Sequence, residues 1–138
     1  MSAKAVNILL VEDDEVDVMT VRRAFDRAKI TDPVFRAGDG VEALELLRSR
    51  ATPVERLLVL LDLNLPRMNG IEFLHELRGD PALRQVPVVV LTTSNDERDK
   101  AEAFEMNVAG YLLKPVTFAS FVELMTSLNR YWSLAEMP

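Results

Sequence analysis

Five short apolar runs alternate along the chain with longer segments of helical spacing. The apolar runs are rich in leucine and β-branched residues and are nearly continuous, which is typical of strands that are covered on both faces. They are Val6–Val11, Val34–Ala37, Leu57–Leu61, Val86–Leu91 and Tyr111–Leu113. The helical segments lie near residues 15–29, 41–50, 71–79, 96–107 and 117–134. This alternation predicts an α/β fold, namely a doubly wound five-stranded parallel sheet with helices on both faces, in three layers α/β/α.

Turn and capping residues agree with this partition. Asp39-Gly40 and Asn69-Gly70 mark the turns into the second and third helices. Ser94 with Glu97 predicts a capping box before the fourth helix. There is no internal repeat, low-complexity segment or linker, so we expect a single domain over residues 1–138 without an attached effector domain.

Composition and charge narrow the classes of function. The 138 residues are 49% hydrophobic and 28% charged, which suits one soluble domain. The net charge of -6 gives no basic face for a phosphate backbone, so nucleic-acid binding is disfavoured. The absence of cysteine excludes thiolate zinc sites and thiol catalysis. No apolar run approaches the ~18 residues of a membrane span, and the start lacks the features of a signal peptide, so we expect a cytoplasmic protein.

Acidic side chains follow two of the predicted strands. Glu12, Asp13 and Asp14 come directly after the first strand, and Asp62 comes directly after the third. In the strand order 2-1-3-4-5 these strands are neighbours, and ligands bind beyond their carboxyl ends. The first three acids could simply cap the following helix. That reading leaves out Asp62, whose carboxylate ends an aliphatic run and needs a partner, and a hard divalent cation such as Mg²⁺ is the usual one.

Two further polar residues stand at strand ends on the same edge. Thr92 follows the fourth predicted strand and Lys114 follows the fifth. Taken singly, the threonine could be a strand-end cap and the lysine a counter-ion for the acids. Together with the acids they predict one functional site, because the motif and its expected structural context agree.

Four stretches of the sequence resemble the CheY-like receiver domains of bacterial two-component signalling, over essentially the whole chain. These stretches are LLVEDDE, LLDLNLPRMNG, VVVLTTS and GYLLKP. The resemblance implies a flavodoxin-like fold of order 2-1-3-4-5. More narrowly, LDLNLPRMNG with RGDPALRQVPVVVLTTSND and the ending NRYW is similar to small response regulators that are paired with bacterial phytochrome kinases.

The resemblance assigns a role to each acid near the expected site. Asp62 would be the phosphoacceptor, and Glu12 and Asp13 would hold Mg²⁺ or Mn²⁺, with Glu12 reaching the ion through water. Asn64 would offer its backbone carbonyl to the same ion.

It also assigns the residues that would respond to the phosphoryl group. Thr92 would be the switch hydroxyl, and Lys114 would contact the phosphoryl oxygens. Tyr111 would be the aromatic side chain that changes rotamer on activation, and Pro115 would follow a cis peptide bond.

The function implied is that of a single-domain response regulator in a two-component phosphorelay. A histidine kinase, such as a bacteriophytochrome, would phosphorylate Asp62, and a partner-binding surface on the fourth helix, fifth strand and fifth helix would switch. We therefore expect no enzyme activity beyond self-phosphorylation from small donors and slow self-dephosphorylation.

Other functions stay open at this point. One alternative is an aspartyl-phosphate-forming hydrolase, although such enzymes typically carry a second Asp two residues after the nucleophile, where this chain has Asn64. Others are a relay carrier that passes the phosphoryl group to a second histidine protein, and a receiver-shaped module that is never phosphorylated.

The last helical segment carries more apolar residues than one sheet contact needs. Its apolar side chains cover an arc of roughly 180°, whereas packing on a sheet needs about 100°. Phe118, Val122, Tyr131 and Trp132 are therefore candidates for a partner surface or a homodimer contact. Equally, these residues could fold over the edge of the sheet.

Overall fold

The computed structural model describes residues 5–138. Its five strands are β1 (Asn7–Val11), β2 (Val34–Ala37), β3 (Leu57–Leu61), β4 (Val88–Thr92) and β5 (Gly110–Leu113). Its five helices are α1 (Glu15–Arg27), α2 (Gly40–Arg48), α3 (Gly70–Gly79), α4 (Glu97–Glu105) and α5 (Phe118–Trp132). Each expected strand and helix is present, with ends shifted by a few residues.

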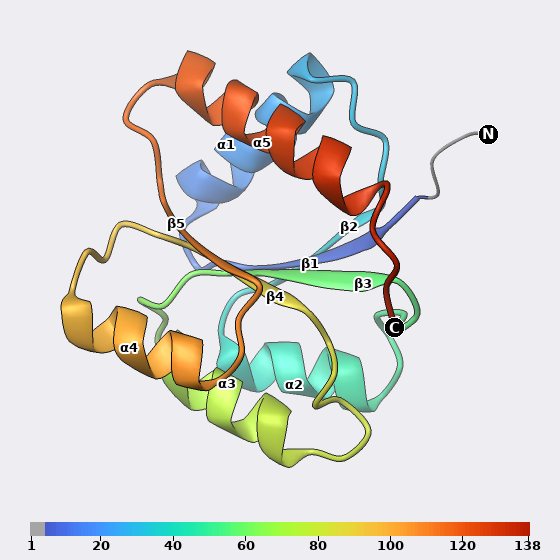
Figure 1. Ribbon diagram of the computed structural model, residues 1–138, viewed down its shortest axis with the longest axis vertical. Helices are drawn as coiled ribbons and strands as arrows, with labels where there is room; N and C mark the ends of the chain where they lie inside the picture. Colours follow the sequence, from blue (N-terminus) through green and yellow to red (C-terminus); the bar gives the residue numbers. More distant parts are fainter. Residues whose placement is uncertain (1–4) are drawn as a thin grey trace.

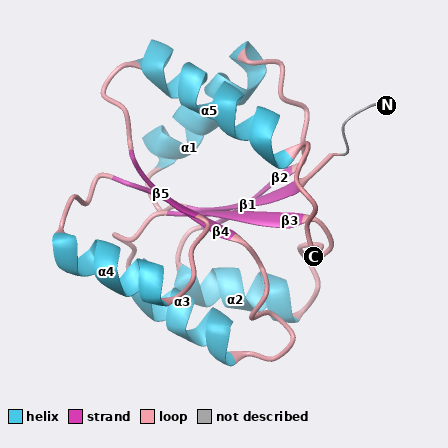
Figure 2. Ribbon diagram, viewed as in Figure 1, coloured by secondary structure: helices cyan, strands magenta, loops and turns pink. Residues whose placement is uncertain are grey.

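The strands form one parallel sheet in the order β2-β1-β3-β4-β5. Helices α1 and α5 cover one face of the sheet, and α2, α3 and α4 cover the other (Figures 1 and 2). The predicted doubly wound α/β/α architecture and its strand order are thereby confirmed. Because all strands run in one direction, their carboxyl ends, which precede α1 to α5, lie at one edge of the sheet.

Two hydrophobic cores lie on the two faces of the sheet. Successive strand side chains point to opposite faces, so Leu9 and Val59 join the core under α2 and α3, while Ile8 and Leu60 join the core under α1 and α5. All five residues of β3 and of β4 are buried. A central strand that is covered on both faces must be apolar throughout, which explains why these runs do not alternate.

The helix starts follow the capping residues with one exception. Asp39 caps α2, and Asn69 caps α3 through a capping box with Glu72. The predicted Ser94–Glu97 box before α4 is wrong. Asp96 is the N-cap there, and its carboxylate accepts the backbone N–H groups of Arg98 and Asp99 at 2.7 and 3.2 Å.

The expected apolar surface on α5 is only partly present. Trp132 is buried, its indole N–H donates to Asp32 at 2.9 Å, and its ring packs near Phe25. It is therefore part of the core between α1 and α5, and its place in the predicted partner surface is wrong. Val122 packs half-buried against the same core, whereas the side chains of Phe118 and Tyr131 are 42% and 69% exposed.

Within residues 5–138, no helix combines the length and the apolar character that crossing a lipid bilayer requires.

Candidate functional site

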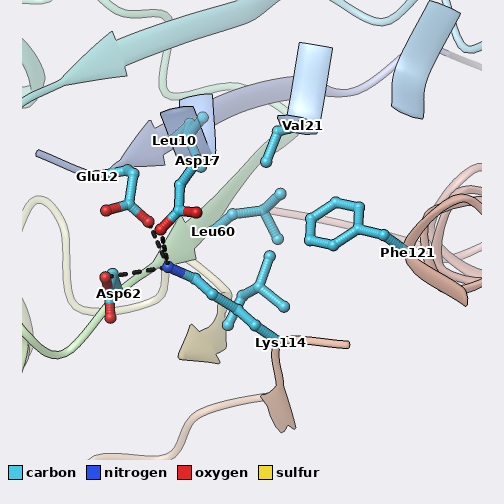
Figure 3. A pocket seen from close by; sticks show the side chains of 9 residues that line it. Leu10, Glu12, Asp17, Val21, Leu60, Asp62, Lys114 and Phe121 are labelled. Carbon is cyan, nitrogen blue, oxygen red and sulfur yellow. Dashed lines mark hydrogen bonds and ion pairs between the residues drawn. The ribbon is translucent and has the colours of Figure 1, made fainter. Parts of the chain in front are cut away.

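Charged side chains converge where β1, β3 and β5 end. Val11 of β1 pairs with Leu61 of β3, so the residues that follow them, Glu12 and Asp62, leave the sheet side by side. Both of these acidic residues are buried, at 3% and 7% exposure. Lys114 follows β5, and its side chain points toward the two acids (Figure 3).

The Lys114 ammonium binds three carboxylates at once. Its Nζ donates to Glu12 at 2.7 Å, to Asp17 at 2.8 Å and to Asp62 at 3.2 Å. Dashed lines mark these three contacts in Figure 3. Lys114 lines a small cavity together with these three acids and with apolar side chains that include Leu60 and Phe121. An ammonium has three N–H donors, so all of them are used within the site.

The Asp62 carboxylate is held through both of its oxygens. Oδ1 accepts the Thr92 hydroxyl at 2.9 Å and the Asn64 backbone N–H at 3.2 Å. Oδ2 accepts the Lys114 ammonium. Thr92 is fully buried at the end of β4, so its hydroxyl comes to Asp62 from inside the protein, whereas Asn64 is exposed.

Burial dominates the electrostatics of Glu12. It raises the pKa of Glu12 from 4.5 to about 7, opposed by the hydrogen bond and the charge of Lys114 and assisted by the negative charge of Asp62. For Lys114, burial lowers the pKa, but the hydrogen bonds to Asp17 and Glu12 outweigh it and hold the pKa above its usual value. The ammonium therefore stays charged, and at Glu12 the effect of burial outweighs the positive charge of Lys114.

Three acids at this edge could share a cation. One carboxylate oxygen from each of Glu12, Asp13 and Asp62 lies within 4.8 Å of the others, and Asp13 is exposed. Clustered carboxylate oxygens are the donor set that hard divalent cations such as Mg²⁺ and Mn²⁺ prefer, so these residues fit such an ion. The backbone carbonyl of Asn64 as a further ligand stays a prediction.

The turn after β3 is seated tightly on the start of α3. The Gly70 N–H donates to the carbonyl of Leu63 at 3.0 Å. A Cβ atom on Gly70 would lie 2.7 Å from the carbonyl oxygen of Asp62 and 2.7 Å from Cα of Leu63. Only glycine therefore allows α3 to begin this close to Asp62.

A hydrogen-bonded chain leads from Thr92 to β5 and α4. The Tyr111 hydroxyl donates to the carbonyl of Ser94 at 2.8 Å, and the Ser94 hydroxyl donates to Asp99 at 2.7 Å. The Ser94 N–H in turn donates to the Thr92 hydroxyl at 3.3 Å. A movement of the Thr92 hydroxyl would therefore change the hydrogen bonds of Ser94, and through them affect Tyr111 and the first turn of α4.

The expected cis peptide before Pro115 is not found, because no peptide bond within residues 5–138 is cis. The trans form is the preferred one for an X-Pro bond. Lys114 reaches the acids with this trans bond in place.

The structure brings together Glu12, Asp13, Asp62, Thr92 and Lys114, as their positions at strand ends predicted. Their individual roles stay predictions.

Sequence reasoning missed two residues that contact this group. Asp17 binds Lys114, and Arg36 of β2 donates to the backbone carbonyls of Glu12 and Asp13. The position of Asp17 in the first turn of α1, just after Glu12 and Asp13, was an available signal. Arg36 gave none, because nothing in a strand sequence tells where a long side chain will reach.

Comparison with known proteins places the site in a family. Residues 8–126 match the response regulator receiver domain. A relative named "Probable methanogenesis regulatory protein FilR2", from Methanothrix harundinacea, is 39% identical over 91% of this chain and 82% of its own length.

Two solved structures are similar throughout. The phosphorylated cyanobacterial phytochrome response regulator RcpA is 33% identical, with a TM-score of 0.88 over 98% of this chain and 99% of its own. The Mn²⁺-bound response regulator Rcp1, a protein of Synechocystis, is 33% identical, with a TM-score of 0.84 over 96% of this chain and 99% of its own. The chain belongs to the response regulator receiver domain family.

Proposed function

We propose that Asp62 is the phosphoacceptor of a two-component switch and that a histidine kinase is its donor. The observation that carries this proposal is that both oxygens of the Asp62 carboxylate are hydrogen-bonded. The Thr92 hydroxyl donates to one oxygen and the Lys114 ammonium donates to the other. Phosphoryl transfer needs mainly positioning and neutralisation of charge. The nitrogen–phosphorus bond of a kinase phosphohistidine breaks as an oxygen–phosphorus bond to Asp62 forms.

Glu12, Asp13 and Asp62 would hold Mg²⁺ or Mn²⁺, together with the carbonyl of Asn64. The bound cation supplies positive charge against the acids and the phosphoryl oxygens. The Mn²⁺-bound form of Rcp1 and the close approach of the three carboxylates support this assignment.

After the cation, Lys114 is the second positive group that contacts the phosphoryl oxygens on Asp62. Its hydrogen bond to Asp62 is the longest of its three, so that donor is the one most easily moved to a phosphoryl oxygen. The Thr92 hydroxyl turns to donate to a phosphoryl oxygen on Asp62. The hydrogen bond that it accepts from the Ser94 N–H is then lost or changed. Because Tyr111 binds the Ser94 carbonyl, its ring moves with this loop.

The output surface comprises α4, β5 and α5. Phe104, Leu113 and Phe118 lie on these elements with 55%, 44% and 42% exposure, so a partner or a second copy of the chain has apolar side chains to bind. Sedimentation with and without phosphorylation tests the homodimer, and a monomer in both states excludes it.

A bacteriophytochrome histidine kinase is the donor that we favour. Support comes from the likeness to RcpA, a phytochrome response regulator, over nearly the full length of both chains. A phosphotransfer race against the histidine kinases of the same genome, scored by the fastest donor, tests this choice.

The function itself is tested by labelling with radioactive acetyl phosphate and Mg²⁺. The wild type should acquire a label that is stable in acid and labile in base, and Asp62→Asn should abolish it. Asp26→Asn, which changes an exposed acid on α1, is the matched control and should label normally. Unchanged labelling of Asp62→Asn rejects the phosphoacceptor, and steady release of phosphate from an organic phosphate would instead favour the hydrolase.

A further inference from the structure

Arg36 reaches from β2 across the end of β1. It pairs in register with Leu10, two residues before Glu12. Its Nε and Nη2 donate to the carbonyl of Glu12 at 3.2 Å each, and Nη2 also donates to the carbonyl of Asp13 at 3.2 Å. Its remaining nitrogen, Nη1, forms an ion pair with the Glu15 carboxylate on α1.

These bonds fall where the backbone leaves regular structure. β1 ends at Val11 and α1 begins at Glu15 after its cap Asp14, so the carbonyls of Glu12 and Asp13 belong to neither element. The Glu12 N–H still donates to Ala37 of β2 at 2.9 Å. The carbonyls of Glu12 and Asp13 instead accept hydrogen bonds from the guanidinium of Arg36. Because the guanidinium is planar and rigid, it holds the two carbonyls in a fixed position relative to each other.

We propose that Arg36 is a positioning residue of the metal site, which sets the affinity for a divalent cation by fixing the backbone that carries the Glu12 and Asp13 carboxylates. This inference rests on the proposed function, because it takes these acids as the ligands. Groups that orient metal ligands from behind commonly affect metal affinity about 10–100-fold.

Whether substitution of Arg36 raises or lowers the Mg²⁺ affinity distinguishes a positioning role from a purely electrostatic one. Arg36 is a cation beside a cation site, so its positive charge alone opposes metal binding. If charge were its whole contribution, Arg36→Met would bind Mg²⁺ more tightly and Arg36→Lys would bind it as the wild type does. If positioning dominates, both variants bind more weakly, because a lysine ammonium cannot reproduce the fork that spans the two carbonyls.

The experiment is calorimetric titration of Mg²⁺ into the unphosphorylated protein, together with urea unfolding in EDTA. We expect the Mg²⁺ affinity of Arg36→Met and of Arg36→Lys to fall about tenfold. Arg98→Met, which removes an exposed arginine from the start of α4, should leave it unchanged. In NMR spectra, the amide signals of Glu12 and Asp13 should shift in both Arg36 variants, which a change of overall stability alone would not cause.

Unchanged or tighter Mg²⁺ binding by Arg36→Met overturns the inference, and so does normal binding by Arg36→Lys. If Arg36→Met does not fold, Arg36→Lys alone decides, because it keeps the positive charge. Failure of the proposed function looks different. In that case Asp13→Asn binds Mg²⁺ as tightly as the wild type, or Asp62→Asn is still labelled by acetyl phosphate.

Discussion

Two partly buried cations stand at opposite ends of the sheet and bind different kinds of oxygen. Lys114, at the carboxyl end of β5, binds the carboxylates of Glu12, Asp17 and Asp62. Arg78, at the end of α3, donates to backbone carbonyls beside the entry to β4 and β5. Its acceptors are Val86 and Met106 at 2.7 Å, Arg84 at 2.9 Å and Asn107 at 3.3 Å.

The difference in acceptors distinguishes two ends of the sheet. At the end near Arg78 the charges are fixed, and we call it the fixed end; at the carboxyl end near Lys114 the charges can change, and we call it the changeable end. Carbonyl dipoles neither titrate nor take up a phosphoryl group, and although burial lowers the pKa of Arg78, a guanidinium stays charged. Carboxylates can gain a proton, share a cation or become acyl phosphates. Hence Lys114 has partners whose charge can change, and Arg78 has partners whose charge cannot.

The largest effect should come from breaking the fixed end. Arg78→Met removes the donor to four carbonyls, two of them in partly buried hydrogen bonds, and should lower the free energy of unfolding by about 3 kcal/mol. Because no titrating group or metal is involved, the loss should be the same at pH 6 and pH 8, with EDTA or with Mg²⁺. Urea unfolding measures it.

Arg78→Lys is the conservative comparison for that experiment. It keeps the charge but has only a point cation in place of the fork, so it should recover part of the loss. A loss that varied with Mg²⁺ would mean that the two ends of the sheet are not independent.

The second effect concerns the contact between α3 and the turn after β3. Gly70→Ala should lower the free energy of unfolding by about 2 kcal/mol, because its Cβ would meet the backbone of Asp62 and Leu63 at 2.7 Å. Displacement of that backbone should also slow labelling by acetyl phosphate.

Gly79→Ala is the matched control for Gly70→Ala, at the other end of the same helix. A Cβ atom there would meet nothing within 4 Å. This substitution should be neutral or slightly stabilising, with normal labelling. Equal effects of the two substitutions would contradict the tight contact at Gly70.

The sequence predicted those parts of the molecule that local chemistry determines. The fully apolar runs around Val59 and Val90 are typical of strands that are covered on both faces. Polar residues at the ends of such runs, Asp62 and Thr92 among them, had to meet at one edge because parallel strands share their direction. The α/β class and the edge that holds the site therefore followed from the pattern, whereas the strand order came from the resemblance to receiver domains.

The sequence did not reveal which distant residues the long side chains contact in the folded protein. Arg36 and Arg78 bind carbonyls through long flexible side chains, and a carbonyl leaves no mark in the sequence. The wide apolar arc of α5 did not tell that Trp132 packs inward while Tyr131 points outward, because the crossing of α5 over α1 decides this.

The third effect belongs to the changeable end and depends on pH. Glu12 has a pKa of about 7 in the folded protein against 4.5 in the unfolded chain. Between these values the folded protein holds the proton more strongly, so its free energy of unfolding falls as the pH rises from 4.5 to 7. Glu12→Gln mimics the protonated acid. In EDTA it should stabilise the protein at pH 8 by on the order of 1 kcal/mol and have no effect at pH 4.5.

Mg²⁺ supplies the control for this prediction. Its binding at pH 8 should stabilise the wild type and reduce the advantage of Glu12→Gln, because the carboxylate then has a cation beside it. A gain for Glu12→Gln that is equal at pH 4.5 and pH 8 would show that burial does not govern this acid.

The smallest effect should come from the ion pair between Arg67 and Asp39 at the same edge, because its arginine is exposed to solvent. Arg67 donates to the Asp39 carboxylate at 2.7 Å, and its side chain is 62% exposed. Burial raises the pKa of Asp39, but the Arg67 bond and the backbone N–H of Glu42 outweigh it, so the pKa lies below 3.8. Stability from the pair is therefore present above about pH 4 and is lost as the pH falls through the lower folded pKa.

Arg67→Gln should accordingly reduce stability only slightly at pH 7, and the reduction should vanish in 1 M salt, where exposed charges are screened. Asp39→Asn keeps the helix cap on α2, because Asn is an equally good N-cap, and should show the same small loss. Urea unfolding at low and high salt measures both variants. If Arg67→Gln destabilised the protein as much as Arg78→Met, the carboxyl edge would be pinned as firmly as the opposite end, and the contrast between a fixed and a changeable end would fail.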